Sequence, residues 1–180
     1  MNLEKNKPTK IFLIGQSGSG KTTLGKKLSV KLKFDFLDTD EFITNEFASS
    51  ISEIFKSKGE LFFRNEEKKI LDSLKNKVNI VVATGGGLPE INDSFEMMQD
   101  NGLVIWIKSS PSEIDKRLLN SNRGHRPLLF NNELSLIENL ETQLEKRYDV
   151  YSKADLIIVN DNIDEAETIE MILEELKNYE

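Results

Sequence analysis

The chain has 180 residues, of which 38% are hydrophobic, and this is enough for one domain with a real core rather than a disordered or fibrous chain. It contains no cysteine and a single histidine, which excludes disulfide scaffolds, cysteine nucleophiles and multi-histidine zinc sites. The net charge of −7 argues against a general binder of nucleic acid or membrane surfaces, because both present phosphate groups to a protein.

The negative charge is concentrated in the last part of the sequence. Residues 154–180 hold nine acidic residues and one lysine, so residues 1–153 are close to neutral, and we interpret the acidic segment as a solvated face. No segment has the pattern of a signal peptide or a membrane span, since the longest apolar runs, such as residues 103–107, are too short. We expect a cytosolic, monomeric protein that binds small molecules, with no nucleic-acid or membrane partner.

Short apolar runs alternate with helical patterns along the chain. We predict strands at residues 10–14, 34–37, 79–83, 103–107 and 156–159. We predict helices at residues 22–33, in a stretch that ends at residue 47, at residues 51–58, 60–75 and 94–100, from Pro111 onwards, and at residues 131–151 and 164–179. Ser50 to Glu53 has the pattern of a capping box, and Pro111 suits the first turn of a helix.

Five strands that alternate with helices predict an α/β domain with three layers, in which a five-stranded, mostly parallel sheet is flanked by helices. In such sheets ligands bind at the carboxyl ends of the strands. The residues that follow each predicted strand are therefore the first place to look for function.

Residues 15–22 (GQSGSGKT) join the first predicted strand to the first predicted helix, which is the context that a phosphate loop requires. Glycines let backbone N–H groups turn towards phosphate oxygens, Lys21 reaches the β and γ phosphates, and the Thr22 hydroxyl can ligate Mg²⁺. The expected ATP-binding residues of this loop are Gly15, Ser17, Gly18, Ser19, Gly20, Lys21, Thr22 and Thr23. Kinases, GTPases and ATPases share this loop, but the small size and the lack of a guanine-reading motif favour a small-molecule kinase.

Polar residues and glycines also follow the second and third predicted strands. Asp38 and Asp40 could serve the metal and the acceptor hydroxyl, although such a cluster is also a common helix cap, and Thr39 or Asp40 could do only that. Three glycines at residues 85–87 permit close approach of a ligand to backbone N–H groups, or form a plain turn. Only five of the 24 basic residues are arginines, so each arginine is a candidate for a bidentate contact.

Taken together, these motifs resemble the shikimate kinase family. In order, the chain carries the phosphate loop, Asp38-Thr39-Asp40, Gly59 to Glu67 (GELFFRNEE), Gly85-Gly86-Gly87, Arg126-Pro127-Leu128-Leu129 and Arg147 to Tyr151. The resemblance implies a nucleoside-monophosphate-kinase-like fold in a single phosphate-loop kinase domain of residues 1–180. It also implies a shikimate-binding helical region at about residues 38–70 and a mobile lid at about residues 120–132.

The resemblance further implies transfer of the γ-phosphoryl group of Mg-ATP to the 3-hydroxyl of shikimate. The implied catalytic residues are Lys21, Asp40 and Arg126, with Asp40 as the candidate base and Arg126 reaching the ATP phosphates from the lid. The implied substrate-binding residues are Asp40, Arg64, Gly85, Gly86, Gly87, Arg147, Phe55 and Phe63, of which the two arginines hold the carboxylate. The implied magnesium residues are Thr22 and Asp38.

Some residues depart from the family pattern or have no assigned role. Ser17 stands where the family usually has methionine, and the loop is more similar to that of gluconate kinases, so a gluconate kinase-like sugar-acid kinase is the alternative enzyme. A nucleotide-dependent regulatory module is the alternative of another class. Arg117 and Arg123 could contact phosphate or adenine from the flanks of the lid, but we favour surface ion pairs for both. We interpret His125 as an exposed lid residue, and we expect an adenine contact near residues 160–163.

Overall fold

The structure is a computed structural model that describes residues 8–91, 93–120 and 135–179. Its strands are β1 (Lys10–Ile14), β2 (Asp35–Asp38), β3 (Ile80–Ala83), β4 (Leu103–Lys108) and β5 (Leu156–Val159). They form one sheet in the order β2-β3-β1-β4-β5, and every neighbouring pair is parallel. The predicted α/β fold with a five-stranded parallel sheet is confirmed.

The helices are α1 (Lys21–Leu32), α2 (Thr39–Glu46), α3 (Ile51–Lys58), α4 (Glu60–Ser73), α5 (Ser94–Asn101), α6 (Pro111–Asn120), α7 (Leu136–Tyr151) and α8 (Glu165–Asn178), with a 3₁₀ turn η1 (Leu88–Glu90). Most predicted bounds agree within two residues. The expected start of α7 at Asn131 is wrong, because Ser135 caps the helix in a capping box with Glu138. The predicted capping box of α3 is confirmed, since Ser50 Oγ accepts from the Glu53 N–H and Glu53 Oε2 accepts from the Ser50 N–H.

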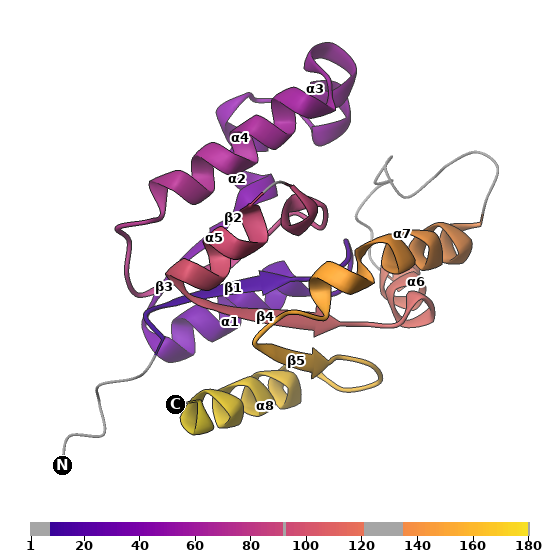
Figure 1. Ribbon diagram of the computed structural model, residues 1–180. Coiled ribbons are helices and arrows are strands. Elements are labelled where there is room, and N and C mark those ends of the chain that lie inside the picture. Colours follow the sequence, from indigo (N-terminus) through magenta and orange to yellow (C-terminus); the bar gives the residue numbers. More distant parts are fainter. Residues whose placement is uncertain (1–7, 92, 121–134, 180) are drawn as a thin grey trace.

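Helices cover both faces of the sheet, in three layers (Figure 1). Side chains alternate along a strand, so Ile11 and Leu13 of β1 pack with α1 and α8 on one face, while Phe12 and Ile14 pack with α4 and α5 on the other. Both groups are buried. Two hydrophobic cores therefore hold the central strand in place and fix the position of the loop that follows it.

The ends of the strands set the position of the site. β1 lies in the centre of the sheet, between β3 and β4, so the loop after β1 lies where the connections diverge to the two sides. Because all strands are parallel, the segments after β1, β2, β3 and β5 meet at one edge. Helices α2, α3 and α4 form an excursion between β2 and β3 that stands beside this edge (Figure 1).

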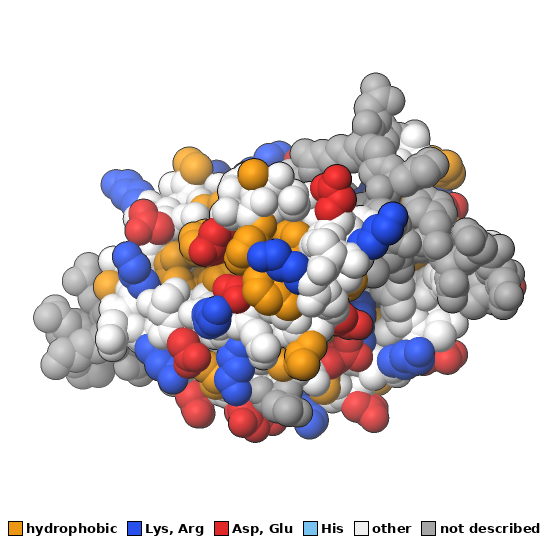
Figure 2. Space-filling view, turned by 90° about the horizontal axis from the view of Figure 1, so that it is seen from above, with side chains coloured by type: hydrophobic (Ala, Val, Ile, Leu, Met, Phe, Trp, Pro, Cys, Tyr) orange, Lys and Arg blue, Asp and Glu red, His pale blue; other side chains and the backbone are white. Residues whose placement is uncertain are grey.

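The acidic segment is a solvated face, as the sequence predicted. Helix α8 buries Ile169, Ile172 and Leu176 against the sheet, and its glutamates are exposed. On the face shown in Figure 2, acidic and basic side chains are interspersed around a group of hydrophobic ones. None of the helices in the described ranges is both long enough and apolar enough to span a bilayer.

Candidate active site

The loop after β1 has the backbone geometry of a phosphate loop. Gly15, Gly18 and Gly20 have positive φ angles of 140°, 88° and 99°, a region that other residues rarely adopt. Gly20 directly precedes α1, so the loop runs into a helix N-terminus, where free N–H groups and the helix dipole favour phosphate.

Lys21 begins α1 and folds back over the loop. Its ammonium group donates to the carbonyl oxygens of Gly15 and Gln16, both at 2.7 Å. The hydroxyl of the next residue, Thr22, donates to Asp38 Oδ2 at 2.6 Å. The loop thus presents a cation and a hydroxyl–carboxylate pair side by side.

Asp38 has two tasks, one on each oxygen. Its Oδ1 accepts from the backbone N–H groups of Asp40 and Glu41, at 3.0 and 3.1 Å, and so caps α2. Its Oδ2 faces Thr22. Hard oxygen atoms of this kind suit Mg²⁺, which binds few protein ligands and keeps several waters, so Thr22 and Asp38 fit the expected metal. The described residues include no cluster of three or more carboxylates, histidines or cysteines that would hold a metal without a bound phosphate.

A half-open cleft of about 860 Å³ adjoins the loop. Its walls include the expected ATP-binding residues Ser17, Gly18, Gly20, Lys21, Thr22 and Thr23, together with Asp38, Asp40 and Gly86. Ser19 is fully buried behind this surface. Further parts of the wall come from α6 and from the segment after β5, and they include Asn160 and Ile163, which belong to the segment in which we expect an adenine contact.

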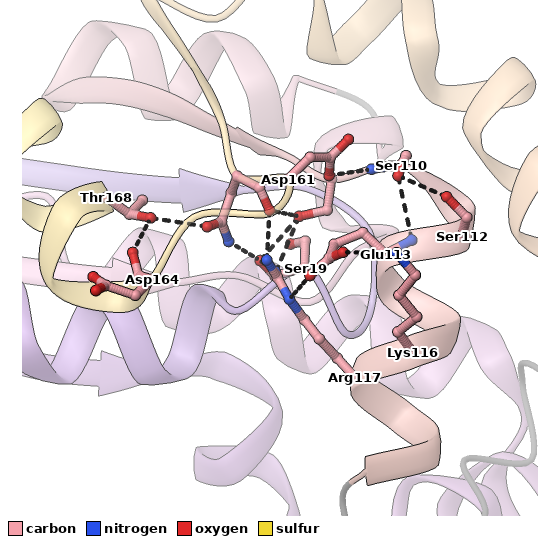
Figure 3. Close-up of polar contacts among 11 residues, drawn as sticks. Ser19, Ser110, Ser112, Glu113, Lys116, Arg117, Asp161, Asp164 and Thr168 are labelled. Atoms are coloured by element: carbon pink, nitrogen blue, oxygen red, sulfur yellow. Dashed lines mark hydrogen bonds and ion pairs between the residues drawn. The ribbon is translucent and has the colours of Figure 1, made fainter.

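Arg117 joins α6 to the phosphate loop (Figure 3). It forms an ion pair with Glu113 at 3.1 Å, as in the favoured interpretation, but both residues line the cleft, which is the side of the molecule named in the alternative left open by the sequence. The side chain is 27% exposed, and its guanidinium also donates to Ser19 O at 3.2 Å and to Asn160 O. The rarity of arginine in this chain was the sequence signal that pointed to such a role.

Asn160 fixes the end of β5 to the same loop. Its Nδ2 donates to Ser19 O at 2.9 Å, and its Oδ1 accepts from the Thr168 hydroxyl of α8 at 2.9 Å. Figure 3 shows Thr168 and Arg117 on the two sides of this contact. The cleft wall is therefore tied to the loop by buried hydrogen bonds that no local sequence motif indicated.

Asp40 and Gly86 of the triple glycine also line the cleft. The Gly85 N–H donates to the Thr39 hydroxyl at 2.8 Å. A methyl group on Gly85 would lie less than 3.0 Å from both Asp40 Oδ1 and Glu67 Oε1, so only glycine leaves room for these two carboxyl groups. The glycines are thus more than a plain turn.

Arg64 and Arg147 flank the triple glycine. A methyl group on Gly87 would lie 2.7 Å from Arg64 Nη2, and one on Gly86 would lie 3.4 Å from Arg147 Nη1. The Arg64 guanidinium also lies 5.8 and 5.7 Å from the ring centres of Phe55 and Phe63, which pack edge to face. The structure therefore brings together the residues that the resemblance assigned to the acceptor.

Both arginines form ion pairs or hydrogen bonds with glutamate and glutamine side chains. The sequence analysis assigned no role to these partners. Arg64 pairs with Glu67 at 2.7 Å and with Glu60 at 2.8 Å. Arg147 pairs with Glu90 at 2.8 Å and donates to Gln143 at 3.3 Å. The i, i+3 and i, i+4 spacings within α4 and α7 were the available signals for Glu67, Glu60 and Gln143.

Burial changes the ionisation of this cluster. Burial raises the pKa of Glu67 to about 7 in spite of the neighbouring Arg64, and the Asp40 charge adds to the rise. Burial lowers the pKa of Arg64, but the Glu67 and Glu60 carboxylates outweigh it and raise the pKa overall. Burial also raises the pKa of Tyr151, whose hydroxyl donates to the Gly86 carbonyl at 2.5 Å. Tyr151 is thus a neutral donor at the triple glycine.

Part of the expected site falls outside the described residues. The lid at about residues 120–132, with Arg126, Arg123 and His125, lies there except for its first residue.

The fold and the site define a phosphate-loop kinase that acts on a small molecule. A model of the shikimate kinase family matches residues 17–177, and the chain belongs to this family. It is 40% identical over 156 residues to a shikimate kinase of Clostridium botulinum strain Okra, a match that covers 87% of this chain and 90% of the relative.

Solved structures agree with this assignment. The shikimate kinase of Bacteroides thetaiotaomicron has a TM-score of 0.86 and 30% identity, with 94% of this chain and 99% of that chain covered. A shikimate kinase of Acinetobacter baumannii in complex with shikimate has a TM-score of 0.84 and 28% identity, with coverage of 94% and 93%.

The similarity to a gluconokinase of Sinorhizobium meliloti is weaker. That structure has a TM-score of 0.64 and 17% identity, with coverage of 97% and 94%, and it shares the fold alone. The alternative of a gluconate kinase is therefore not supported.

Proposed function

We propose that the protein transfers the γ-phosphoryl group of ATP to the 3-hydroxyl of shikimate, giving shikimate 3-phosphate and ADP. One observation carries the proposal. Within one site, a phosphate loop with Lys21 lies across from Asp40, and Asp40 lies beside a triple glycine flanked by Arg64 and Arg147. This arrangement suits a nucleotide on one side and an anionic polyhydroxyl acceptor on the other.

Asp40 is the proposed base. Its carboxylate faces the cleft beside Gly85, where it can accept a hydrogen bond from the acceptor hydroxyl and take the proton as the new P–O bond forms. Phosphoryl transfer needs mainly positioning and charge stabilisation, and Lys21 supplies a positive charge at the β and γ phosphates. The proton ends on Asp40 and the displaced phosphate oxygen ends on ADP.

Arg64 and Arg147 are the proposed partners of the shikimate carboxylate. A guanidinium group offers parallel N–H donors that match a carboxylate. Arg64 extends from α4 and Arg147 from α7, and both guanidinium groups lie beside the triple glycine. Phe55 and Phe63 would line the ring pocket beside Arg64. Glu60, Glu67 and Glu90 would keep the arginines oriented before the acceptor arrives.

Mg²⁺ and Arg126 complete the proposed machinery. Thr22 would ligate Mg²⁺ and Asp38 would hold its water shell, and the ion when bound neutralises negative charge on the phosphates. Arg126 would contribute a further positive charge at the phosphates. Arg117, Asn160 and Ile163 line the part of the cleft proposed for the adenine.

A coupled ADP-release assay tests the proposal directly. The protein is given ATP and magnesium with shikimate, with gluconate or without acceptor. Shikimate is expected to stimulate ADP release strongly, and mass spectrometry should then detect a monophosphorylated shikimate. Stimulation by gluconate alone would indicate the sugar-acid kinase, and acceptor-independent turnover that shikimate leaves unchanged would indicate the regulatory nucleotide module.

A further inference from the structure

Gln16 makes a buried contact that the proposed mechanism does not use. It lies in the phosphate loop and is only 2% exposed. Its side-chain Nε2 donates to the carbonyl oxygen of Leu140 in α7 at 2.7 Å. Its Oε1 is buried with no hydrogen-bond partner within the described part of the chain. Burial of an unsatisfied amide oxygen is unfavourable, so a methionine or leucine would suit packing alone better than glutamine does.

The main chain of the same residue holds the catalytic lysine. The Gln16 carbonyl oxygen accepts from Lys21 Nζ at 2.7 Å and from the Ser19 N–H at 3.2 Å. Phosphate oxygens that attract Lys21 compete with this carbonyl for its ammonium group. Binding of a nucleotide therefore acts on the residue whose side chain contacts α7.

Helix α7 carries the acceptor arginine on the same face as this contact. Leu140 and Arg147 are seven residues apart, which is close to two helical turns, so they lie on the same side of the helix. The Leu140 carbonyl contacts Gln16 of the phosphate loop, and the Arg147 guanidinium lies beside Gly86. Leu140 is fully buried and packs against Ile114 of α6. Because Leu140 and Arg147 belong to one continuous helix, a shift of the helix at Leu140 would also move Arg147.

The three segments meet again at Gly86. A methyl group on Gly86 would lie 3.3 Å from Gly15 O, 3.4 Å from Ser17 N and 3.4 Å from Arg147 Nη1. The Tyr151 hydroxyl also donates to the Gly86 carbonyl. The phosphate loop, the triple glycine and α7 are therefore in direct contact at this point, and Gln16 adds a hydrogen bond between the first and the last of them.

We propose that Gln16 is a positioning residue that couples nucleotide binding to acceptor binding. Phosphates on the loop set the position of Gln16, its amide sets the position of α7, and α7 presents Arg147 to the acceptor carboxylate. The inference rests on the proposed function, because it assigns the acceptor carboxylate to Arg147. Coupling of this kind is reciprocal, so the acceptor strengthens nucleotide binding by the same factor.

The test compares the parent protein with Gln16→Met, which keeps the length of the side chain and removes the donor, and with Gln16→Asn, which keeps the amide but is too short to reach Leu140. Gln99→Met is the matched control, since Gln99 is exposed on α5 and also donates to a backbone carbonyl, that of Lys153. Calorimetry gives the Kd of shikimate with and without a non-hydrolysable ATP analogue, and the Kd of the analogue with and without shikimate. Trp106, the single tryptophan, packs against Tyr148 and Tyr151 of α7 and provides a fluorescence readout.

In the parent protein and in Gln99→Met, the analogue is expected to lower the Kd of shikimate by a factor of about five or more. In both Gln16 variants this factor should fall below about two. The factor by which shikimate lowers the Kd of the analogue should fall equally. If Gln16 serves folding alone, its substitution would raise every Kd but leave unchanged the ratio of the Kd values measured without and with the second ligand. That result would overturn the proposal. A parent protein in which the analogue does not change the Kd of shikimate would also overturn it. A parent protein that does not phosphorylate shikimate would refute the proposed function itself, which the turnover assay detects separately.

Discussion

The two sides of the cleft hold their charged groups in different ways. On the nucleotide side, Lys21 donates to two backbone carbonyls, and the wall is fastened by hydrogen bonds that converge on the Ser19 carbonyl. On the acceptor side, Arg64 and Arg147 pair with three glutamates. The nucleotide side is shaped by the backbone, whereas the acceptor side is shaped by side-chain charges.

This difference teaches what each ligand must do on arrival. Phosphates meet a helix N-terminus, and they compete with neutral backbone carbonyls for the Lys21 ammonium group, which any nucleoside triphosphate can do. In the proposed function, the acceptor carboxylate instead shares two arginines with carboxylates that already hold them. The proposal therefore makes selectivity for the acceptor depend on a balance of charges. The four substitutions below test the two sides from the largest expected effect to the smallest.

Asp40→Asn tests whether the two sides can be separated. The variant keeps the size of the side chain and removes the proton acceptor, so kcat should fall by a factor on the order of 10² to 10⁴. The Kd of ATP measured without acceptor should stay within about twofold. Glu46→Gln, an exposed position at the end of α2, is the matched control and should keep parent activity. A near-normal kcat for Asp40→Asn would remove Asp40 from the chemistry.

Glu67→Gln tests the charge balance on the acceptor side. The pKa of Glu67 is raised from 4.5 to about 7 in the folded protein, so the folded state binds this proton more tightly than the unfolded state does. The resulting stability is complete below about pH 4.5 and is lost as the pH rises through about 7. The glutamine stays neutral, so the parent should lose on the order of 3 kcal/mol relative to the variant between pH 4.5 and pH 8.

Urea denaturation at several pH values measures this difference in the free energy of unfolding. Glu46→Gln corrects for the loss of one negative charge. If the difference in the free energy of unfolding between parent and Glu67→Gln is the same at pH 5 and pH 8, folding does not raise the pKa of Glu67, and the prediction is contradicted.

Arg147→Lys tests the bidentate contact. Lysine keeps the charge but loses the fork of donors, so the KM for shikimate should rise about tenfold or more, while the KM for ATP changes much less. Steady-state kinetics with each substrate varied gives both values. Lys146→Gln, at the exposed neighbouring position, is the control and should alter neither. An unchanged KM for shikimate would show that Arg147 serves the structure of α7 and does not bind the acceptor.

Ser50→Ala is expected to have the smallest effect. It removes the cap of α3 within the acceptor-side excursion, so the melting temperature should fall by about 2–4 °C. Because Ser50 is exposed and has no contact with the cleft residues described above, kcat and both KM values should stay at parent levels. A change in the KM for shikimate would show that α3 is part of the acceptor site.

The sequence predicts those parts of the site whose geometry depends on residues that are neighbours in the chain. The glycines at residues 15, 18 and 20 and the helix that follows them are consecutive in sequence, so their pattern predicts the loop geometry directly. Arg64 and Arg147 were assigned by resemblance. The sequence named Thr39 or Asp40 as the possible helix cap, but the structure shows that Asp38 forms it.

The rest depends on contacts between distant segments. Gln16 and Leu140 are 124 residues apart, and Ser19 and Asn160 are 141 residues apart. No periodicity or spacing reports such pairs, because they form only when the order of the strands brings the two segments to one edge of the sheet. The ionisation of Glu67 is hidden for the same reason, since it depends on burial beneath Gly85.

The contact between Asn160 and Ser19 also has a consequence for folding. The phosphate loop follows β1, but its partner wall follows β5 and is fixed by Thr168 of α8. Nucleotide can thus meet a complete cleft only after β5 and α8 have joined the other elements. A partly folded state that lacks these two elements gains no stability from the ligand, whereas the folded state does.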